Sequence, residues 1–351
     1  MKKDANQAAI PIFLCTDNNY VVPTYFAIYS LLDNYHGDSD IDLYILTSDD
    51  VTEDSHILLL SLHEKYSFCK MYVVNMKNSF ESVRINSSHV SKATLYRLLI
   101  PRIVKTINNH KSINEPRIEK CIYLDSDIIV EGDITELYNI DINGFCFGGV
   151  RDHYCANDSR TTLREMLNIP TLKDYINAGV LLINIKEIDE CGFSQQLETY
   201  GYRNEFQYND QDVINSVCYG KIKVIPLKYN AMTTCLYYND KEFYEQYGDL
   251  NIEEARRKPV IIHFILRKKP WSYRLSVKAS RWWMYVKKQD QHVKQAYIYP
   301  FLKAHRSSAS EIAREATKNT MIYLRIFNPI RRTYSFLKST IDRYPKIFNS
   351  K

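Results

Sequence analysis

Two carboxylates, Asp125 and Asp127, interrupt an apolar stretch that runs from Cys121 to Val130. Ionised carboxylates are unfavourable among such neighbours unless something positive pairs with them. In a continuous strand the two side chains share one face, whereas in a turn they converge from two sides, and the spacing fits either arrangement. Carboxylate oxygens suit Mg²⁺ or Mn²⁺, and such an ion also attracts a diphosphate. An ordinary solvated turn is the alternative, so the pair alone does not establish a metal site.

A histidine later in the chain is the candidate third ligand. His263 lies within the apolar segment 260–265, and a lone histidine in such a strand is usually a hydrogen-bonded core residue. The basic segment Lys269-Pro270-Trp271, six residues on, favours a ligand role instead. An imidazole nitrogen beside two carboxylates shifts the preference from Mg²⁺ toward Mn²⁺.

The elements that must position these groups begin with an alternation of strands and helices. The pattern predicts strands at 10–16, 41–47 and 69–75, with helices at 22–35 and 51–66 between them. This order implies a parallel sheet with ligands at the carboxyl ends of its strands. A Gly-x-Gly-x-x-Gly motif does not follow the first strand, which disfavours a dinucleotide fold of the usual kind.

The later elements carry the remaining polar groups. We expect a helix at 91–104, broken near Pro101, and then the Asp-Ser-Asp strand. Further strands are expected at 145–150, 177–185 and 260–265, and a helix begins near Tyr208. We predict a catalytic domain over 8–275 and a basic, helix-prone tail over 276–351.

The net charge of +5 hides a strong asymmetry, because the segment 256–351 holds 23 Lys and Arg but 4 Asp and Glu. Basic residues mixed with aromatic ones suit the surface of an anionic membrane. Nucleic acid is the competing partner, and we do not expect it. For Trp282 and Trp283 the simpler expectation is packing against the catalytic domain.

Composition places the chain in a reducing compartment. The eight cysteines are scattered through apolar segments without a Cys-x-x-Cys, which favours buried thiols over disulfides or a zinc site. We find neither a signal sequence nor a run of about 18 apolar residues. The expected location is the cytoplasm, at the inner face of the plasma membrane.

Six motifs together resemble one known family over roughly residues 10–275. They are Thr16-Asp17-Asn18-Asn19-Tyr20, Tyr96-Arg97-Leu98, Leu124-Asp125-Ser126-Asp127, Asn177-Ala178-Gly179-Val180, Asp210-Gln211-Asp212, and His263-Phe264 with Lys269-Pro270-Trp271. In this order they are similar to glycosyltransferase family 8, which holds bacterial lipopolysaccharide galactosyl- and glucosyltransferases. The resemblance implies a GT-A fold, an α/β architecture with a mixed sheet flanked by helices. It also implies a UDP-sugar donor, Mn²⁺ (with Mg²⁺ as the alternative) and retention of anomeric configuration.

The resemblance assigns roles to individual residues. It makes Asp125, Asp127 and His263 the metal ligands. The residues that it places around the UDP-sugar donor are Thr16, Asp17, Tyr20, Arg97, Asp125, Ser126, Asn177, Ala178, Gly179 and Lys269. Ordinary structural roles compete with several of these: an Asx turn for Asp17, a salt bridge for Arg97 and a solvated surface for Lys269.

The resemblance also places Asp210 and Gln211 nearest the reacting carbon, and Asp152 matches a position that faces the acceptor. A glutamine amide is a poor nucleophile, so Gln211 fits better as a stabiliser of the transition state. Asp210 then orients a sugar hydroxyl, or acts as the nucleophile if retention proceeds by double displacement. The sequence leaves both mechanisms open. The expected acceptor is a membrane-anchored glycan of lipopolysaccharide, lipooligosaccharide or capsule, and the donor is UDP-galactose or UDP-glucose.

One position departs from the family, because Leu266 stands where a glycine usually lets the backbone close over the diphosphate. A leucine there is expected to hold the loop further out, which weakens the role of Lys269. It motivates a second hypothesis, a UDP-sugar-binding protein that has lost turnover. A third is a basic membrane adaptor that uses the α/β domain as a scaffold.

Overall fold

The centre of the molecule is a seven-stranded mixed sheet with the order β3-β2-β1-β4-β7-β6-β8. The computed structural model describes residues 8–83, 91–203, 206–237 and 241–307. The strands are β1 (Ile10–Thr16), β2 (Ile41–Thr47), β3 (Cys69–Asn75), β4 (Lys120–Leu124), β6 (Phe147–Arg151), β7 (Ile176–Asn184) and β8 (Ile222–Val224). The first four strands in chain order run parallel, and β7 is antiparallel to both β4 and β6.

A second, three-stranded sheet brings the predicted ligands together. It consists of β5 (Ile128–Val130), β10 (Ile261–His263) and β9 (Ala231–Met232) in the order β5-β10-β9. The two aspartates therefore lie in the link between β4 of the large sheet and β5 of the small one. Since β5 and β10 are antiparallel with Ile128 opposite His263, the pairing places the imidazole beside Asp127.

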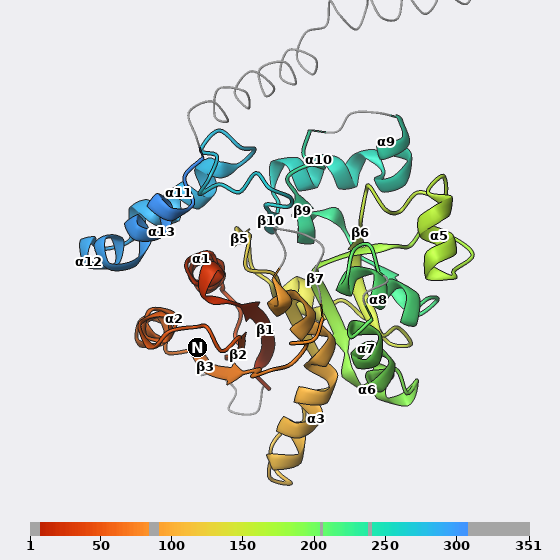
Figure 1. The fold of residues 1–351 in the computed structure, drawn as a ribbon, viewed down its shortest axis with the longest axis horizontal. Coiled ribbons are helices and arrows are strands. Elements are labelled where there is room, and N and C mark those ends of the chain that lie inside the picture. The colour runs from red at the N-terminus through yellow and green to blue at the C-terminus, as the bar shows by residue number, and fades with distance from the viewer. Residues whose placement is uncertain (1–7, 84–90, 204–205, 238–240, 308–351) are drawn as a thin grey trace, which may run out of the picture.

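Helices cover both faces of the large sheet (Figure 1). Alternate residues of β1 point to different cores, Ile12 and Leu14 to one and Phe13 and Cys15 to the other. The helical segments up to residue 257 are η1 (Asn18–Tyr20), α1 (Val21–Asp33), α2 (Glu53–Lys65), η2 (Lys92–Leu99), α3 (Ile100–His110), α4 (Thr135–Asn139), α5 (Thr161–Leu167), α6 (Ile185–Glu190), α7 (Ser194–Gly201), α8 (Asp210–Val217), η3 (Leu227–Asn230), α9 (Lys241–Tyr247) and α10 (Asp249–Arg257). A strand buried on both faces in this way reads as a continuous apolar run, as 10–16 does.

Most of the sequence-based elements are confirmed, and the first three strands have the expected bounds. The expected helix at 91–104 is instead a 3₁₀ segment over 92–99 followed by α3, which continues to His110. Pro101 lies in the first turn of α3, where its missing N–H has no partner to lose. The sequence located the break but not the longer helix after it.

The last described helices pack against the domain rather than standing apart from it. They are α11 (Ala279–Lys288), α12 (Gln291–Val293), η4 (Lys294–Ile298) and α13 (Tyr299–Ala304), and Figure 1 shows this group beside α1. Trp282 is buried against Phe26 of α1, with ring centroids 4.8 Å apart. The packed body thus extends beyond the predicted boundary at 275, because the apolar face of α11 joins the core. The expected packing of Trp282 on the catalytic domain is confirmed.

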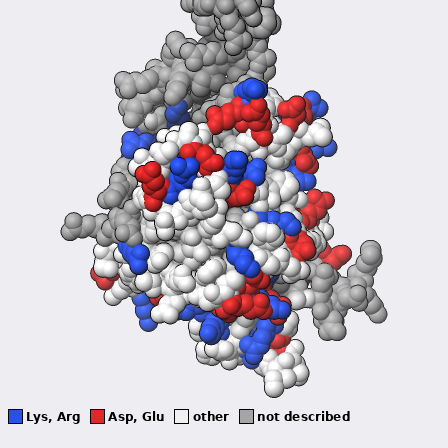
Figure 2. Space-filling model, turned by 90° about the vertical axis from the view of Figure 1, so that its right-hand side faces the viewer, with Lys and Arg blue, Asp and Glu red and all other residues white. Residues whose placement is uncertain are grey.

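The remainder of the predicted tail, 308–351, lies outside the described residues. Within the described part, none of the helices has the length and apolar character needed to cross a membrane. Figure 2 views the molecule from the side of α5 and α9, and acidic and basic side chains are interspersed on that face.

Candidate active site

A cavity of about 670 Å³ opens where the ends of β1, β4, β6 and β7 meet the small sheet. Its volume is that of a typical ligand site. All of the site residues singled out in the sequence line it, although they come from distant parts of the chain: Thr16, Asp17, Tyr20, Arg97, Asp125, Ser126, Asp127, Asp152, Asn177, Ala178, Gly179, Asp210, Gln211, His263 and Lys269. The structure therefore brings the predicted set together, while the role of each residue stays a prediction.

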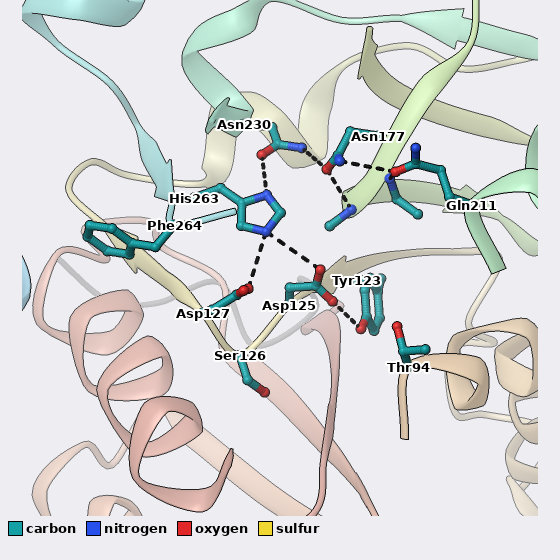
Figure 3. A network of polar contacts seen from close by, with 12 residues as sticks. Thr94, Tyr123, Asp125, Ser126, Asp127, Asn177, Gln211, Asn230, His263 and Phe264 are labelled. Atoms are coloured by element: carbon teal, nitrogen blue, oxygen red, sulfur yellow. Dashed lines mark hydrogen bonds and ion pairs between the residues drawn. The ribbon is translucent and has the colours of Figure 1, made fainter. Parts of the chain in front are cut away.

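Three of these residues form a group that can hold a metal ion. Ligand atoms of Asp125, Asp127 and His263 lie within 4.8 Å of one another. His263 Nε2 is 3.2 Å from Asp127 Oδ1 and 3.7 Å from Asp125 Oδ2 (Figure 3). The aspartates approach from a turn rather than from one strand face. Two carboxylates and one imidazole are a donor set that suits Mn²⁺.

The backbone behind this group is shaped to fit it. A Cβ added to Gly179 would lie 2.2 Å from His263 Cε1 and 2.8 Å from Asp125 Oδ2. The Gly179 carbonyl also accepts a hydrogen bond of 2.8 Å from the Asp125 backbone N–H. The family resemblance placed this glycine beside the UDP-sugar donor. The structure shows that the residues it first accommodates are two of the candidate ligands.

Cations pair with both aspartates. Arg97 is buried, and its Nη2 lies 2.7 Å from Asp125 Oδ1 while its Nε lies 3.1 Å from Asp210 Oδ2. The Lys269 ammonium contacts Asp127 and donates a hydrogen bond of 2.7 Å to the Phe264 carbonyl. We call Arg97, Asp125, Asp127, His263 and Lys269 the metal half of the cavity.

The pKa values of Asp127 and Asp210 respond differently to burial and to these cations. Burial raises the pKa of Asp210 to about 6 and outweighs the attraction of Arg97. Burial also acts to raise the pKa of Asp127, but Lys269 and His263 together hold that pKa below its ordinary value. Asp127 is therefore ready to bind a cation over a wide pH range, whereas Asp210 titrates near neutrality.

The loop after His263 reaches the cavity in spite of its leucine. Leu266 adopts a left-handed conformation with φ of 64°, which is uncommon for a side chain of this type. Because the backbone turns there, Lys269 still contacts Asp127. Trp271 anchors the loop, with its ring centroid 5.9 Å from that of Tyr20 and 5.7 Å from that of Trp282. The expected outward displacement of the loop is not what this geometry shows.

The residues assigned to the nucleotide lie at the end of β1. Asp17 caps the short segment η1, since its side chain accepts a hydrogen bond of 3.0 Å from the Tyr20 backbone N–H. Ser126 points away from His263 in Figure 3, and its hydroxyl donates to the Cys15 carbonyl at 2.8 Å. Thr24 donates to the same hydroxyl at 2.7 Å. Asp17 and Ser126 thus hold the local structure of this corner.

Amide side chains dominate the opposite side, which we call the sugar half: Asp152, Asn177, Ala178 and Gln211. Asn177 Nδ2 donates to Gln211 Oε1 at 3.0 Å and to Asp152 Oδ2 at 3.2 Å. The Ala178 N–H donates to the same Gln211 oxygen at 3.1 Å, and Gln211 Nε2 lies 3.3 Å from Asp152 Oδ2. The two amide side chains are therefore held by each other, by one backbone N–H and by the Asp152 carboxylate.

A comparison with protein-family profiles gives a match over most of the chain. The profile described as "Glycosyl transferase family 8" matches residues 11–274. The chain belongs to glycosyl transferase family 8. The matched span includes the whole cavity lining, from Cys15 to Lys269.

Relatives within this family are distant in sequence. Glycosyltransferase GlyF of Streptococcus pneumoniae serotype 4 is 28% identical over 277 residues, which cover 78% of this chain and 60% of GlyF. A lipopolysaccharide 1,2-glucosyltransferase of Escherichia coli is 27% identical over 261 residues, covering 73% of this chain and 71% of that protein. A relative from Haemophilus influenzae is 27% identical over 226 residues, which cover 63% of that protein. The chain thus spans about three fifths of the length of this relative and of GlyF.

Solved structures of other glycosyltransferases confirm the fold. The galactosyltransferase LgtC, in complex with donor and acceptor sugar analogs, superposes with a TM-score of 0.63 at 21% identity, over 82% of this chain and 99% of LgtC. The bifunctional glycosyltransferase WbbM gives a TM-score of 0.68 at 19% identity, over 88% of this chain and 53% of WbbM. The predicted GT-A architecture, a mixed sheet flanked by helices, is therefore correct.

Several cavity residues escaped the sequence analysis of this family-8 chain. Tyr123 donates to Asp125 Oδ1 at 2.7 Å, and Thr94 lies 3.3 Å from Asp210 Oδ1. Asn230, a fully buried residue outside the lining, contacts both His263 and Asn177. Tyr154, close to the predicted acceptor residue Asp152, is an exposed side chain in the lining. An asparagine between apolar residues is a weak signal, because it is common in ordinary loops.

Proposed function

We propose that this chain is a retaining, Mn²⁺-dependent hexosyltransferase. It moves galactose or glucose from a UDP-sugar to a hydroxyl of a cell-surface glycan, such as a lipopolysaccharide, lipooligosaccharide or capsule acceptor. The observation that carries the proposal is the meeting of Asp125, Asp127 and His263 in one cavity with Gln211, inside a family-8 fold. The names of the Escherichia coli glucosyltransferase and of LgtC support a hexose donor.

The metal half would hold the UDP diphosphate. Asp125, Asp127 and His263 are the residues that would bind Mn²⁺, which when bound supplies a Lewis acid for the negative charge of the departing UDP. Lys269 places a second cation beside the same site, where it stabilises the developing charge on the phosphate. Arg97 keeps Asp125 oriented through its ion pair. Asp17 and Tyr20 lie at the corner where uracil and ribose would bind.

The hydrogen bonds of Gln211 favour a front-face mechanism. Its Oε1 accepts from the Ala178 N–H and from Asn177 Nδ2, so both lone pairs are engaged. An oxygen in this state is poorly suited to attack the anomeric carbon. In the front-face route the bond from that carbon to UDP breaks, and the acceptor hydroxyl bonds on the same face. The hydroxyl proton passes to the leaving phosphate oxygen, while Gln211 and Asp210 orient the sugar.

The acceptor would bind beside Asp152 and Tyr154. One oxygen of Asp152 faces Asn177 and Gln211, and the other accepts from the Tyr154 backbone N–H at 3.1 Å. The carboxylate therefore connects the reacting centre to a tyrosine that is 66% exposed. Arg160 backs this tyrosine, with Cζ 3.9 Å from the ring centroid. A fixed aromatic face of this kind suits the CH-rich face of a pyranose.

Donor and turnover are tested together by measuring UDP release with UDP-galactose and UDP-glucose in the presence of Mn²⁺. We expect one donor to be turned over faster, and transfer when an oligosaccharide acceptor is added. UDP and Mn²⁺ binding with neither transfer nor hydrolysis would favour the binding-protein hypothesis instead. The left-handed backbone at Leu266 argues for the enzyme, because it lets Lys269 reach the metal half.

Membrane association of the C-terminal tail is part of the proposal. The basic and aromatic composition of 306–351 supports it. Deleting 306–351 should abolish flotation with anionic vesicles while transfer to a soluble acceptor persists. Continued flotation of the truncated protein would contradict this role. If the full chain also turns over no UDP-sugar, the adaptor hypothesis is favoured instead.

A further inference from the structure

A buried asparagine joins the metal half of the cavity to the sugar half. Asn230 is the last residue of η3 and is fully buried. Its Oδ1 lies 2.9 Å from His263 Nδ1, and its Nδ2 donates to Asn177 Oδ1 at 2.9 Å (Figure 3). One side chain thus touches a candidate metal ligand at one end and a sugar-half amide at the other.

Backbone donors determine which end of each neighbouring amide is oxygen. The Gly179 N–H donates to Asn177 at 3.0 Å, and the Ala178 N–H donates to Gln211 at 3.1 Å. A backbone N–H can only donate, so the side-chain atoms that receive these bonds are oxygens. Rotating either amide by a half turn would set N–H against N–H. The orientations of Asn177 and Gln211 therefore follow from the main chain.

This constraint continues to the histidine ring. Because Asn177 Oδ1 accepts, the atom of Asn230 that faces it must be the donating Nδ2. Asn230 Oδ1 then faces His263, and the ring nitrogen that it meets, Nδ1, must carry a proton. Nε2 is left as the nitrogen directed at Asp125 and Asp127, which is the arrangement that a metal ligand needs.

We propose that Asn230 is a positioning residue that fixes His263 for the metal and, with the same amide, fixes Asn177 and through it Gln211 for the sugar. The inference rests on the proposed function, since it needs a metal and a sugar in one cavity. The hydrogen bonds run in one direction, from His263 through Asn230 and Asn177 to Gln211. A change in the imidazole is thereby linked to the amide beside the reacting centre.

Two substitutions of similar size separate the two contacts of Asn230. Asn230→Leu removes both hydrogen bonds, and calorimetry should show Mn²⁺ affinity weakened by about 10- to 100-fold. Asn230→Asp keeps an acceptor for His263 but replaces the amide N–H that donates to Asn177 with a carboxylate oxygen. Its Mn²⁺ affinity should stay within about threefold of wild type, while turnover of the UDP-sugar falls at least tenfold (about 1.4 kcal/mol).

The protonation of His263 Nδ1 can be measured directly, and it would not depend on Asn230 if that residue only filled space in the core. In ¹⁵N-histidine-labelled, metal-free protein, His263 Nδ1 should carry a proton, because the Asn230 oxygen that it faces can only accept. His263→Gln identifies the signal. The same measurement on Asn230→Leu should show the proton redistributed between the two nitrogens.

Either of two results overturns the inference: a wild-type ring whose Nδ1 carries no proton, or a folded Asn230→Leu variant that binds Mn²⁺ as tightly as wild type. If Asn230→Leu does not fold, the wild-type nitrogen spectrum and Asn230→Asp still decide. Failure of the proposed function looks different. The wild-type chain would then release no UDP from either UDP-sugar in the presence of Mn²⁺, even with the proton on Nδ1.

Discussion

In the metal half of the cavity charges are held by opposite charges, whereas in the sugar half amides are held by backbone groups, by one another and by the Asp152 carboxylate. Lys269 and His263 contact Asp127, and Arg97 contacts Asp125. On the other side, Gln211 is held by the Ala178 N–H and by Asn177. These ion pairs can rearrange on binding of a metal ion and a diphosphate, because the metal can take the place of Arg97 or Lys269 as the partner of an aspartate. The amides have a single set of partners, which suits a fixed orientation of the sugar.

The largest effect is expected from removing a charge of the metal half. Asp127→Ala should lower Mn²⁺-dependent turnover by at least about 10³-fold, because it deletes a ligand and leaves Lys269 without its carboxylate. Glu64→Gln, on the exposed face of α2, is the matched control and should leave turnover unchanged. UDP release assays measure both. Turnover by Asp127→Ala within a few-fold of the control would refute the metal role.

The acidic group between the halves should give the pH dependence. With its pKa raised to about 6 by burial, Asp210 is protonated below that pH, and kcat/KM should fall up to about tenfold per pH unit there. Asp210→Asn should lower activity at neutral pH and remove this acidic limb. A limb of unchanged midpoint in Asp210→Asn would assign it to another group.

Asp210 should also make stability depend on pH, but in the opposite direction to activity. The folded-state pKa of Asp210 lies above its ordinary value of 3.8, so the folded protein binds more protons between about pH 4 and 6. Its contribution to the free energy of unfolding is therefore largest at low pH and is lost as pH rises through about 6. Chemical denaturation of Asp210→Asn should lack this component.

The sugar half should respond to changes on its acceptor side without loss of donor chemistry. Tyr154→Ala should raise the acceptor KM about tenfold, because the pyranose loses its aromatic face. Tyr154→Phe should retain near wild-type KM, since the ring remains. Hydrolysis of the UDP-sugar without acceptor should be unchanged in both. Tyr219→Ala, another exposed tyrosine, is the control; an equal change in KM there would remove the acceptor role from Tyr154.

The smallest effect is expected at the leucine of the metal-half loop. Leu266→Gly relieves a left-handed conformation that disfavours leucine by roughly 1–2 kcal/mol, offset by about 0.4–1 kcal/mol from greater freedom in the unfolded chain. Thermal unfolding should shift upward by a few degrees, and UDP affinity should rise less than about threefold. Lys278→Gly, at φ of 59° outside the cavity lining, should give the same stability gain without the affinity change. A fall in UDP affinity in Leu266→Gly would show that the side chain contributes to binding.

The two halves also differ in how far the sequence could predict them. Asp125 and Asp127 stand out because carboxylates in an apolar segment demand a partner. The bounds of the first three strands of the large sheet were also predicted correctly. The turn between the two sheets was left open, since spacing alone does not distinguish it from a strand. Asn230 was missed because its role depends on two atoms positioned by β10 and β7, which no local pattern reports. The packing of Trp282 on the catalytic domain could be predicted, because an indole in a basic helix is unfavourable in water unless it is covered.

The central claim is that Asp125, Asp127 and His263 hold one metal ion that in turn holds the UDP diphosphate. Titrating UDP into the full-length protein by calorimetry, with Mn²⁺ and then with a chelator, tests it most directly. The account predicts saturable 1:1 binding with Mn²⁺, and loss of that binding in the chelator and in Asp127→Ala. Equal UDP affinity with and without metal would contradict it.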